Sequence, residues 1–229
     1  MAIRSLLKAV SPFEQIPTRS LTGAIGIFAL VFTVVTSLVH CWMNTLSVMM
    51  TIKMNAIHLG TLMALTFLLY PAFPGSPRER PSLPDWVFAG MSLFGMVYLI
   101  AVYNRLLDAN MEPLFMDLAV SVMTMAVLAE ASRRSIGLPL TILSVFFLAY
   151  TRFGPLFPGL FAHRGFNWER IIVRMALTDE GIYGTTLTVS ASYVFMFILF
   201  GSFLAATRTS EFFNDLAMAL AGRFRGGPA

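Results

Sequence analysis

Charged side chains that interrupt apolar stretches are the first candidates for chemistry in this sequence. Asp117 lies in a run that is otherwise apolar from Pro113 to Leu128. A charge at membrane depth is costly to bury, so such a residue is a candidate functional site by default. A second interpretation places Asp117 one turn into a helix, near the outer membrane interface. There its carboxylate would interact with free backbone N–H groups.

Glu130, Arg133 and Arg134 form a second charged group directly after that run. The arginines follow the glutamate by three and four positions, so on a helix they share its face, which predicts a local ion pair. We interpret the two arginines as anchors at the cytoplasmic surface of a membrane, where basic residues gather. The alternative is that they bind a substrate.

Two histidines, His40 and His58, end one apolar run and begin the next, so both are expected toward the same membrane face. Facing histidines on adjacent helices can ligate a haem iron. The alternative is that each histidine makes ordinary hydrogen bonds near a helix end. The first interpretation predicts a haem-binding membrane anchor, and the second predicts no cofactor at all.

Other signatures of chemistry are absent from the sequence. It has no glycine loop that cradles phosphate, no cysteine–histidine cluster and no nucleophile beside a base at a known motif spacing. Cys41 is the only cysteine, so no disulfide can form within the chain. We therefore expect no catalytic site, no metal site and no bound cofactor, and we predict that the protein is not an enzyme.

Long gaps in charge indicate which elements must position these residues. No charged residue occurs in the 33 positions between Arg19 and Lys53, or in the 27 positions between Glu180 and Arg208. A helix of about 20 apolar residues crosses a bilayer core. The chain is 57% hydrophobic and 12% charged, whereas soluble domains have about 25% charged residues. These values predict an all-α integral membrane protein.

Six membrane-spanning helices and one amphipathic helix are predicted, after a basic arm at residues 1–20. The spans cover, approximately, residues 21–42, 55–73, 85–104, 113–128, 137–152 and 182–207. Residues 168–177 place apolar and charged side chains on opposite helix faces and begin with a tryptophan, which suits the lipid headgroup layer. Packing of this helix on a neighbouring protein domain is the alternative.

The distribution of basic residues predicts that both termini are cytoplasmic. Across six spans, ten Lys and Arg residues fall on the N-terminal side and six on the other side. Four of those six lie in or just before one long connection: Arg152, Arg164, Arg170 and Arg174. Cytoplasmic loops carry the excess of basic residues. The net charge of +4 is thereby explained by membrane orientation, and nucleic acid is not expected as a partner.

The C-terminal third carries a distinctive set of short strings. They are TDEGIYG at 178–184, VSASYVF at 189–195, FGSFL at 200–204, FFNDLA at 212–217 and GRFRGGPA at 222–229. Together they resemble the fused permeases of tripartite ATP-independent periplasmic (TRAP) transporters, in particular those that pair with a TAXI-type periplasmic binding protein. The resemblance covers most of residues 20–229.

This resemblance implies a sodium-coupled importer of organic acids in the bacterial inner membrane, supplied by the periplasmic protein. In such permeases a small part of about four helices is joined to a large part of about twelve that carries the substrate. The resemblance implies that the chain is divided into a small-subunit-like domain of about five helices at 21–153, an extracytoplasmic connection at 154–181 and the start of the large domain at 182–229. Docking of the binding protein is expected at the connection, through Arg164, Arg170 and Arg174.

A fused permease is longer than this chain, so the resemblance also implies an N-terminal portion, a fragment without the hairpin that holds substrate and sodium. We expect the substrate and ion site beyond residue 229, and no transport by this portion alone. Its expected partners are the remainder of the permease, the binding protein and the lipid bilayer. Two alternatives stay open: the haem-binding anchor built on His40 and His58, and a non-catalytic membrane assembly protein.

Overall fold

The computed structural model describes residues 18–73, 75–207 and 209–221, and all regular structure in these ranges is helical. Six of the described stretches are long and apolar enough to cross a membrane. They are α2 (Gly23–Thr45), α3 (Thr51–Leu69), α4 (Leu83–Asp108), α5 (Phe115–Ser135), α6 (Leu138–Phe153) with the turn η1 (Gly154–Leu156), and a last span made of α8 (Thr185–Val189), η3 (Ser190–Val194) and α9 (Phe195–Ala206). The prediction of an all-α membrane protein with about six spans is confirmed. The basic arm lies largely outside the described residues.

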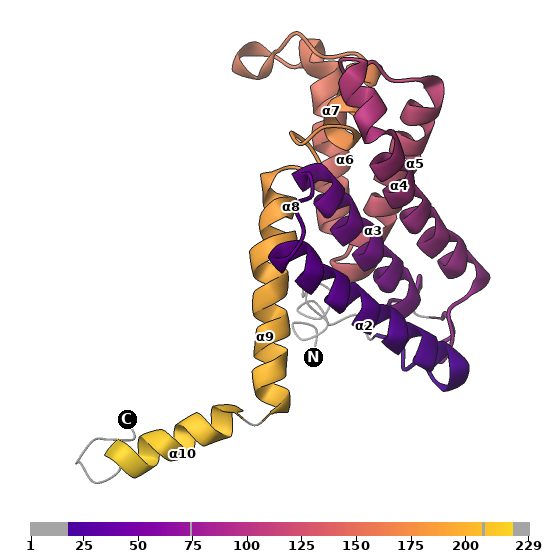
Figure 1. Cartoon of the computed structure of the whole chain (residues 1–229). Coiled ribbons are helices and arrows are strands. Elements are labelled where there is room, and N and C mark those ends of the chain that lie inside the picture. The colour runs from indigo at the N-terminus through magenta and orange to yellow at the C-terminus, as the bar shows by residue number, and fades with distance from the viewer. Residues whose placement is uncertain (1–17, 74, 208, 222–229) are drawn as a thin grey trace, which may run out of the picture.

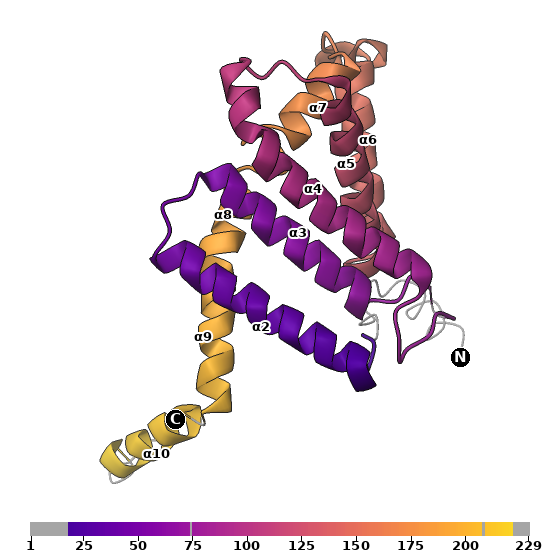
Figure 2. The same ribbon diagram turned by 45° about the vertical axis from the view of Figure 1, so that its right-hand side comes forward.

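Helix α3 is the central helix of the bundle. In its membrane-crossing window 67% of the residues are buried, against 33% or less in each of the other five spans. It runs beside α4 and also contacts α2, α5 and α8 (Figures 1 and 2). Polar side chains on such a helix are surrounded by protein, so they avoid the cost of exposure to lipid.

Two glycines allow the central helices to approach closely. A β-carbon added at Gly60 of α3 would lie 2.5 Å from Cβ of Met96 in α4, and one added at Gly95 of α4 would lie 2.6 Å from Oγ1 of Thr124 in α5. Membrane helices associate largely through close packing, which small residues permit. The three helices therefore form a tightly packed group that holds its polar side chains in fixed positions.

The observed helix bounds extend two of the predicted spans. Helix α4 runs on to Asp108, and α5 runs to Ser135 instead of ending near residue 128. Glu130, Arg133 and Arg134 consequently lie within the last turns of α5, so their spacing does place them on one helix face. At the start of α4, the Asp85 carboxylate accepts from the backbone N–H of Ser82 at 2.7 Å, and the Asp85 N–H donates to the Ser82 carbonyl at 3.0 Å.

The last span leaves the bundle along much of its length. Helix α9 contacts α2 but carries exposed phenylalanines at positions 197, 200 and 203. Helix α10 (Thr209–Ala221) then turns away from α9 and lies apart from the other helices (Figures 1 and 2). A helix after residue 207 is not among those predicted, because that stretch is short and mixes polar with apolar residues.

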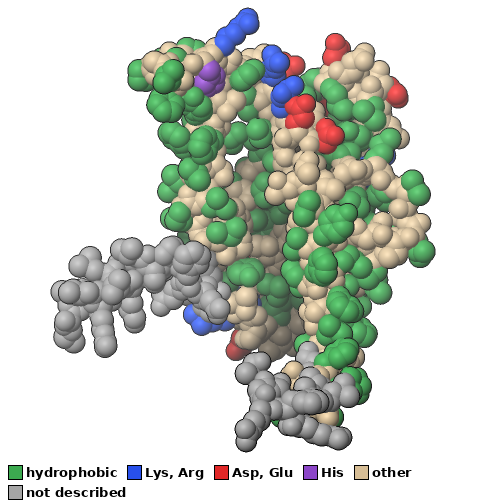
Figure 3. Space-filling model, turned by 90° about the vertical axis from the view of Figure 1, so that its left-hand side faces the viewer, with side chains coloured by type: hydrophobic (Ala, Val, Ile, Leu, Met, Phe, Trp, Pro, Cys, Tyr) green, Lys and Arg blue, Asp and Glu red, His purple; other side chains and the backbone are tan. Residues whose placement is uncertain are grey.

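The two ends of the bundle differ in the side chains that they carry. We call the end where α4 stops and α5 begins the connection end, because it also carries η2 (Gly159–Phe161) and α7 (Trp168–Ala176) from the long connection. Charged side chains gather at this end, above a surface with many hydrophobic side chains (Figure 3). At the other end, which we call the arm end, α2 begins next to the basic N-terminal arm.

Candidate docking pocket and buried polar clusters

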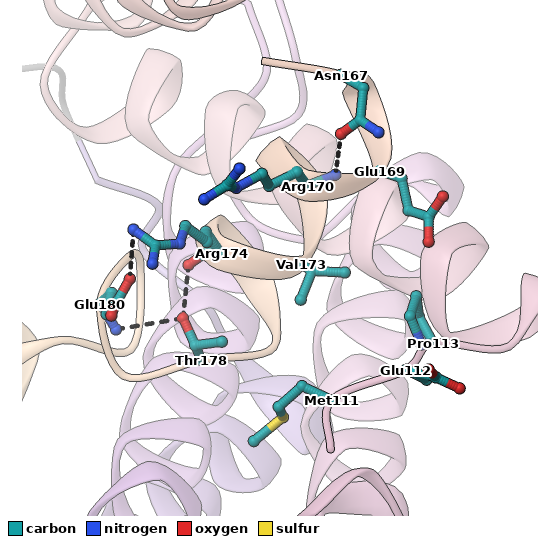
Figure 4. A pocket seen from close by; sticks show the side chains of 10 residues that line it. All are labelled: Met111, Glu112, Pro113, Asn167, Glu169, Arg170, Val173, Arg174, Thr178 and Glu180. Atoms are coloured by element: carbon teal, nitrogen blue, oxygen red, sulfur yellow. Dashed lines mark hydrogen bonds and ion pairs between the residues drawn. The ribbon is translucent and has the colours of Figure 1, made fainter. Parts of the chain in front are cut away.

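A cavity of about 440 Å³ opens at the connection end, between the α4–α5 loop and α7 (Figure 4). The loop contributes Met111, Glu112 and Pro113; α7 with its cap contributes Asn167, Glu169, Arg170, Val173 and Arg174; the turn that follows contributes Thr178 and Glu180. Two of the three arginines predicted to dock a partner, Arg170 and Arg174, therefore line this cavity, which we call the docking pocket. Arg164 is exposed on the connection but is not one of the lining residues.

Helix α7 is positioned by a side-chain cap and by its apolar face. The Oδ1 atom of Asn167 accepts a hydrogen bond from the backbone N–H of Arg170 at 3.0 Å, which satisfies a free donor of the first turn. Ile171 and Ala176 are buried, and α7 packs against α5 and α6. The amphipathic helix is thus present, and its apolar face packs on this chain's own bundle. Its place in the lipid headgroup layer stays a prediction.

Charged side chains of both signs line the docking pocket. Glu112 and Glu169 lie toward one side, and Arg170, Arg174 and Glu180 lie toward the other (Figure 4). Arg174 pairs with Glu180 at 2.9 Å, and both side chains are more than half exposed. An ion pair in water contributes little to stability. These charges are therefore available to a partner at small cost to the fold.

Asp117 lies at the connection end with its carboxylate fully buried. Its oxygens accept from the backbone N–H of Leu114 at 2.7 Å, which supports the helix-start interpretation. They also accept from Nη2 of Arg105 at 2.5 and 2.6 Å and from the Tyr98 hydroxyl at 2.7 Å. With these donors the carboxylate is satisfied within the protein, so the geometry favours a structural role over ligand binding.

At the arm end, Asp85 joins two buried arginines. Its carboxylate accepts from Nη2 of Arg19 at 2.6 Å and from Nη1 of Arg134 at 2.5 Å, and all three side chains are 1% exposed or less. The backbone N–H and hydroxyl of Ser82 donate to the same carboxylate. The two arginine partners of Asp85 lie 66 and 49 residues away in the sequence, so the spacing of residues does not predict them.

Arg134 continues this cluster into α5. Its Nε donates to Glu130 at 2.7 Å, and its guanidinium lies over the rings of Phe67 and Phe88. Arg133 also pairs with Glu130, so the predicted local ion pairs are present. The interpretation of both arginines as surface anchors is wrong for Arg134, which is only 2% exposed. Arg134 instead neutralises a buried carboxylate between packed helices.

His40 and His58 are both buried and contact each other, with 2.8 Å between His40 Nε2 and His58 Nδ1. The outer nitrogens face Thr36 and Ser190, at 2.7 and 3.1 Å. The ring of Phe195 stacks on His40 with 4.0 Å between centroids. Every imidazole nitrogen of the pair thus has a protein partner, so this geometry does not support haem ligation. The sequence places the two histidines together but does not reveal Ser190.

Polar contacts from neighbouring residues hold the last span beside the histidines. The amide of Asn44 donates to the carbonyl of Ala191 at 3.1 Å. The amide of Asn55 donates to the carbonyl of Tyr183 and to Oγ1 of Thr188, both at 2.7 Å. Burial raises the pKa of the Tyr183 phenol above its ordinary value. No group of three or more potential metal ligands occurs in the described part of the chain.

Comparison with known proteins finds one family model. Residues 122–229, a little under half of the chain, match the model described as "Tripartite ATP-independent periplasmic transporter, DctM component". The match begins within α5 and continues through α6, α7, the last span and α10. No curated protein and no solved structure matches the chain. The resemblance to TRAP permeases is thereby confirmed, and the match covers only part of the chain.

Proposed function

Because residues 122–229 match the model of a TRAP transporter permease component, we propose that the chain is a membrane component of a sodium-coupled secondary transporter. It would import organic acids that a TAXI-type periplasmic binding protein delivers. The family match carries this proposal, and the six membrane-crossing stretches agree with it. We also propose that residues 21–153 form a small-subunit-like domain and that the permease domain starts at residue 182. The family match itself begins earlier, at residue 122.

The proposed role for α2 to α5 is to brace the part of the transporter that moves. Buried charge clusters lie at both ends of this group: Asp85 with its arginines at the arm end and Asp117 with Arg105 at the connection end. Removing one partner of a buried ion pair is costly, which disfavours motion between the helices that such a pair joins. The remainder of the permease would pack against α9, whose aromatic side chains are exposed.

The proposed location is the bacterial inner membrane, with both termini in the cytoplasm. Described basic residues at the arm end include Arg78, Arg80 and Arg133, in agreement with a cytoplasmic surface there. The connection end would then face the periplasm and meet the binding protein. Reporter fusions at the two termini test this orientation, and termini on opposite sides of the membrane would contradict it.

We place the contact with the binding protein at the docking pocket. The pocket lies at the connection end, and the exposed residues Arg164, Arg170 and Arg174 lie in or near it. Complementary charges speed the encounter of two proteins and set its specificity. The test measures binding between the chain in lipid nanodiscs and the TAXI-type protein of the same genome. Changing all three arginines to alanine is expected to weaken binding about tenfold, roughly 1.4 kcal/mol.

The matched control changes Arg78 and Arg80 to alanine, because both are exposed at the opposite end of the bundle. Binding should be unchanged in this variant. Equal binding by all variants would refute the docking surface without affecting the transporter assignment. That assignment is tested separately, by deleting the gene in its host. Sodium-dependent uptake of an organic acid should be lost and then restored by a plasmid copy, and uptake that persists would refute the assignment.

A further inference from the structure

A continuous row of hydrogen bonds crosses three helices near the connection end. It runs from the carbonyl of Thr36 to Nδ1 of His40, from His40 Nε2 to His58 Nδ1, and from His58 Nε2 to the hydroxyl of Ser190, at 2.7, 2.8 and 3.1 Å. Thr36 and His40 belong to α2, His58 belongs to α3, and Ser190 begins the π-helical turn η3. Wide π-helical turns are rare and occur frequently at functional sites.

The direction of every bond in this row follows from its first member. A carbonyl oxygen can only accept, so His40 Nδ1 must carry a hydrogen and donate it to Thr36. A neutral imidazole carries a single N–H, and therefore His40 Nε2 is an acceptor. His58 Nδ1 must then donate to it, which leaves His58 Nε2 to accept from the Ser190 hydroxyl. In the neutral state both rings are consequently Nδ1–H tautomers.

The same row can take up one proton without losing a hydrogen bond. A proton added at His58 Nε2 makes that nitrogen a donor to the Ser190 oxygen, and the bond between the two rings persists. Passing the His58 Nδ1 proton to His40 moves the charge to the other ring. A second proton would place two N–H donors face to face across 2.8 Å. We propose that the His40–His58 pair is a binding site for a single proton, at the joint between α2, α3 and the last span.

The surroundings of the pair allow a proton to bind but provide no carboxylate to neutralise it. Besides Thr36 of α2, the described partners of the two imidazoles come from the last span: the Ser190 hydroxyl and the Phe195 ring. Among the described contacts of the two imidazoles there is no Asp, Glu, Lys or Arg. The face of Phe195, stacked on His40, favours a cation through its ring electrons.

Protonation would change only one of the contacts that hold η3. Ser190 would switch from donor to acceptor, whereas the bond from Asn44 to the carbonyl of Ala191 contains no titratable group. The joint should therefore remain closed when one proton is bound. Repulsion between two protonated rings would open it. The pair thus makes the attachment of the last span sensitive to strong acidification and tolerant of a single proton.

Histidine-selective ¹⁵N NMR of the full chain in nanodiscs tests the proposal directly, because the sequence contains only three histidines. The third, His163, is an internal reference, because it is expected to be the other neutral tautomer, Nε2–H. Its Nε2 faces the carbonyl of Tyr150 at 3.0 Å, and its Nδ1 accepts from the backbone N–H of Gly165 at 3.1 Å. At neutral pH we expect two Nδ1–H tautomers and one Nε2–H tautomer. His163→Gln should remove the Nε2–H signal and leave the other two unchanged.

On acidification, the NMR signals of His40 and His58 should shift together as the pair takes up its first proton, because the titration of a coupled pair belongs to both rings. An Nε2–H tautomer of either residue at neutral pH would overturn the proposal. Two independent one-proton titrations would overturn it as well. Ser190→Ala should move the Nε2 signal of His58, whereas Ser192→Ala should not, because Ser192 bonds only to the carbonyl of Thr188. Equal effects of these two substitutions would exclude the proposed role of Ser190.

Discussion

Arg134 and Asp85 form an ion pair in which neither side chain is more than 1% exposed, and it joins the end of α5 to the start of α4. Arg19 approaches the same carboxylate from the other side. A single aspartate thus holds two cations that reach it from distant parts of the sequence. This cluster and the one around Asp117 join α4 and α5 at both of their ends.

Replacing Asp85 with asparagine should destabilise the protein strongly. Arg19 would remain buried without a negative partner, and Arg134 would keep only Glu130. Changes that leave a buried charge unpaired cost about 3–5 kcal/mol. Thermal unfolding in detergent, followed by circular dichroism, measures the effect. Glu180→Gln is the control, because it removes an ion pair that is more than half exposed and should cost about 0–1 kcal/mol. Similar losses of stability in the two variants would show that the cluster at Asp85 stabilises the protein no more than the exposed pair of Arg174 and Glu180.

Tyr98→Phe should have a modest effect on stability. It removes one donor to Asp117, which keeps Arg105 and the backbone N–H of Leu114. The expected cost is about 1 kcal/mol, the usual contribution of one hydrogen bond. Asp117→Ala should cost more, since the charge of Arg105 would lose its partner. The same unfolding measurement ranks the two variants, and the reverse order would contradict the proposed cluster.

Gly60→Ala should loosen the contact between α3 and α4. The added β-carbon would lie 2.5 Å from Cβ of Met96, so the helices must separate, and overpacking of this kind costs about 1–3 kcal/mol. Gly90→Ala is the matched control, because nothing lies within 4 Å of a β-carbon there. It should be neutral or slightly stabilising, since alanine favours helix formation. A harmless Gly60→Ala would mean that these helices are not closely packed at Gly60.

Binding of the periplasmic partner should weaken as salt concentration rises, because exposed charges are screened over about 8 Å at physiological ionic strength. Arg170→Glu should slow association more than it speeds dissociation, as is usual for charges at the rim of an interface. A kinetic binding assay, with the chain immobilised on a surface and the partner in solution, gives both rates. Association rates that are independent of salt and of this substitution would contradict an electrostatic docking surface.

The spans could be predicted from the sequence because each requires a long uncharged stretch, and such stretches are visible without knowledge of the fold. The ion pairs of Glu130 with Arg133 and Arg134 were equally accessible, since partners three and four positions apart must meet on a helix. The face shared by His40 and His58 followed from their places at consecutive helix ends. These are all consequences of spacing along the chain.

The remaining contacts depend on tertiary packing that spacing does not encode. Arg134 looked like a surface anchor because its position at a helix end is typical of one, and its partner Asp85 lies 49 residues away. The donors of Arg105 and Tyr98 to Asp117 also come from a different helix. The contact between Ser190 and His58 could not be predicted for the same reason, because the two residues are 132 positions apart in the sequence. The docking pocket likewise combines a loop and a helix that are distant in sequence.

The central position of α3 also bears on how the protein is made. Asn55 finds its partner Tyr183 only 128 residues later in the chain. While the ribosome is still synthesising the intervening helices, these polar groups have no native partner in the bilayer. We expect the insertion machinery, or the early neighbours α2 and α4, to shield the nascent α3. The contacts of Asn55 can form only after the stretch that carries Tyr183 and Thr188 has emerged.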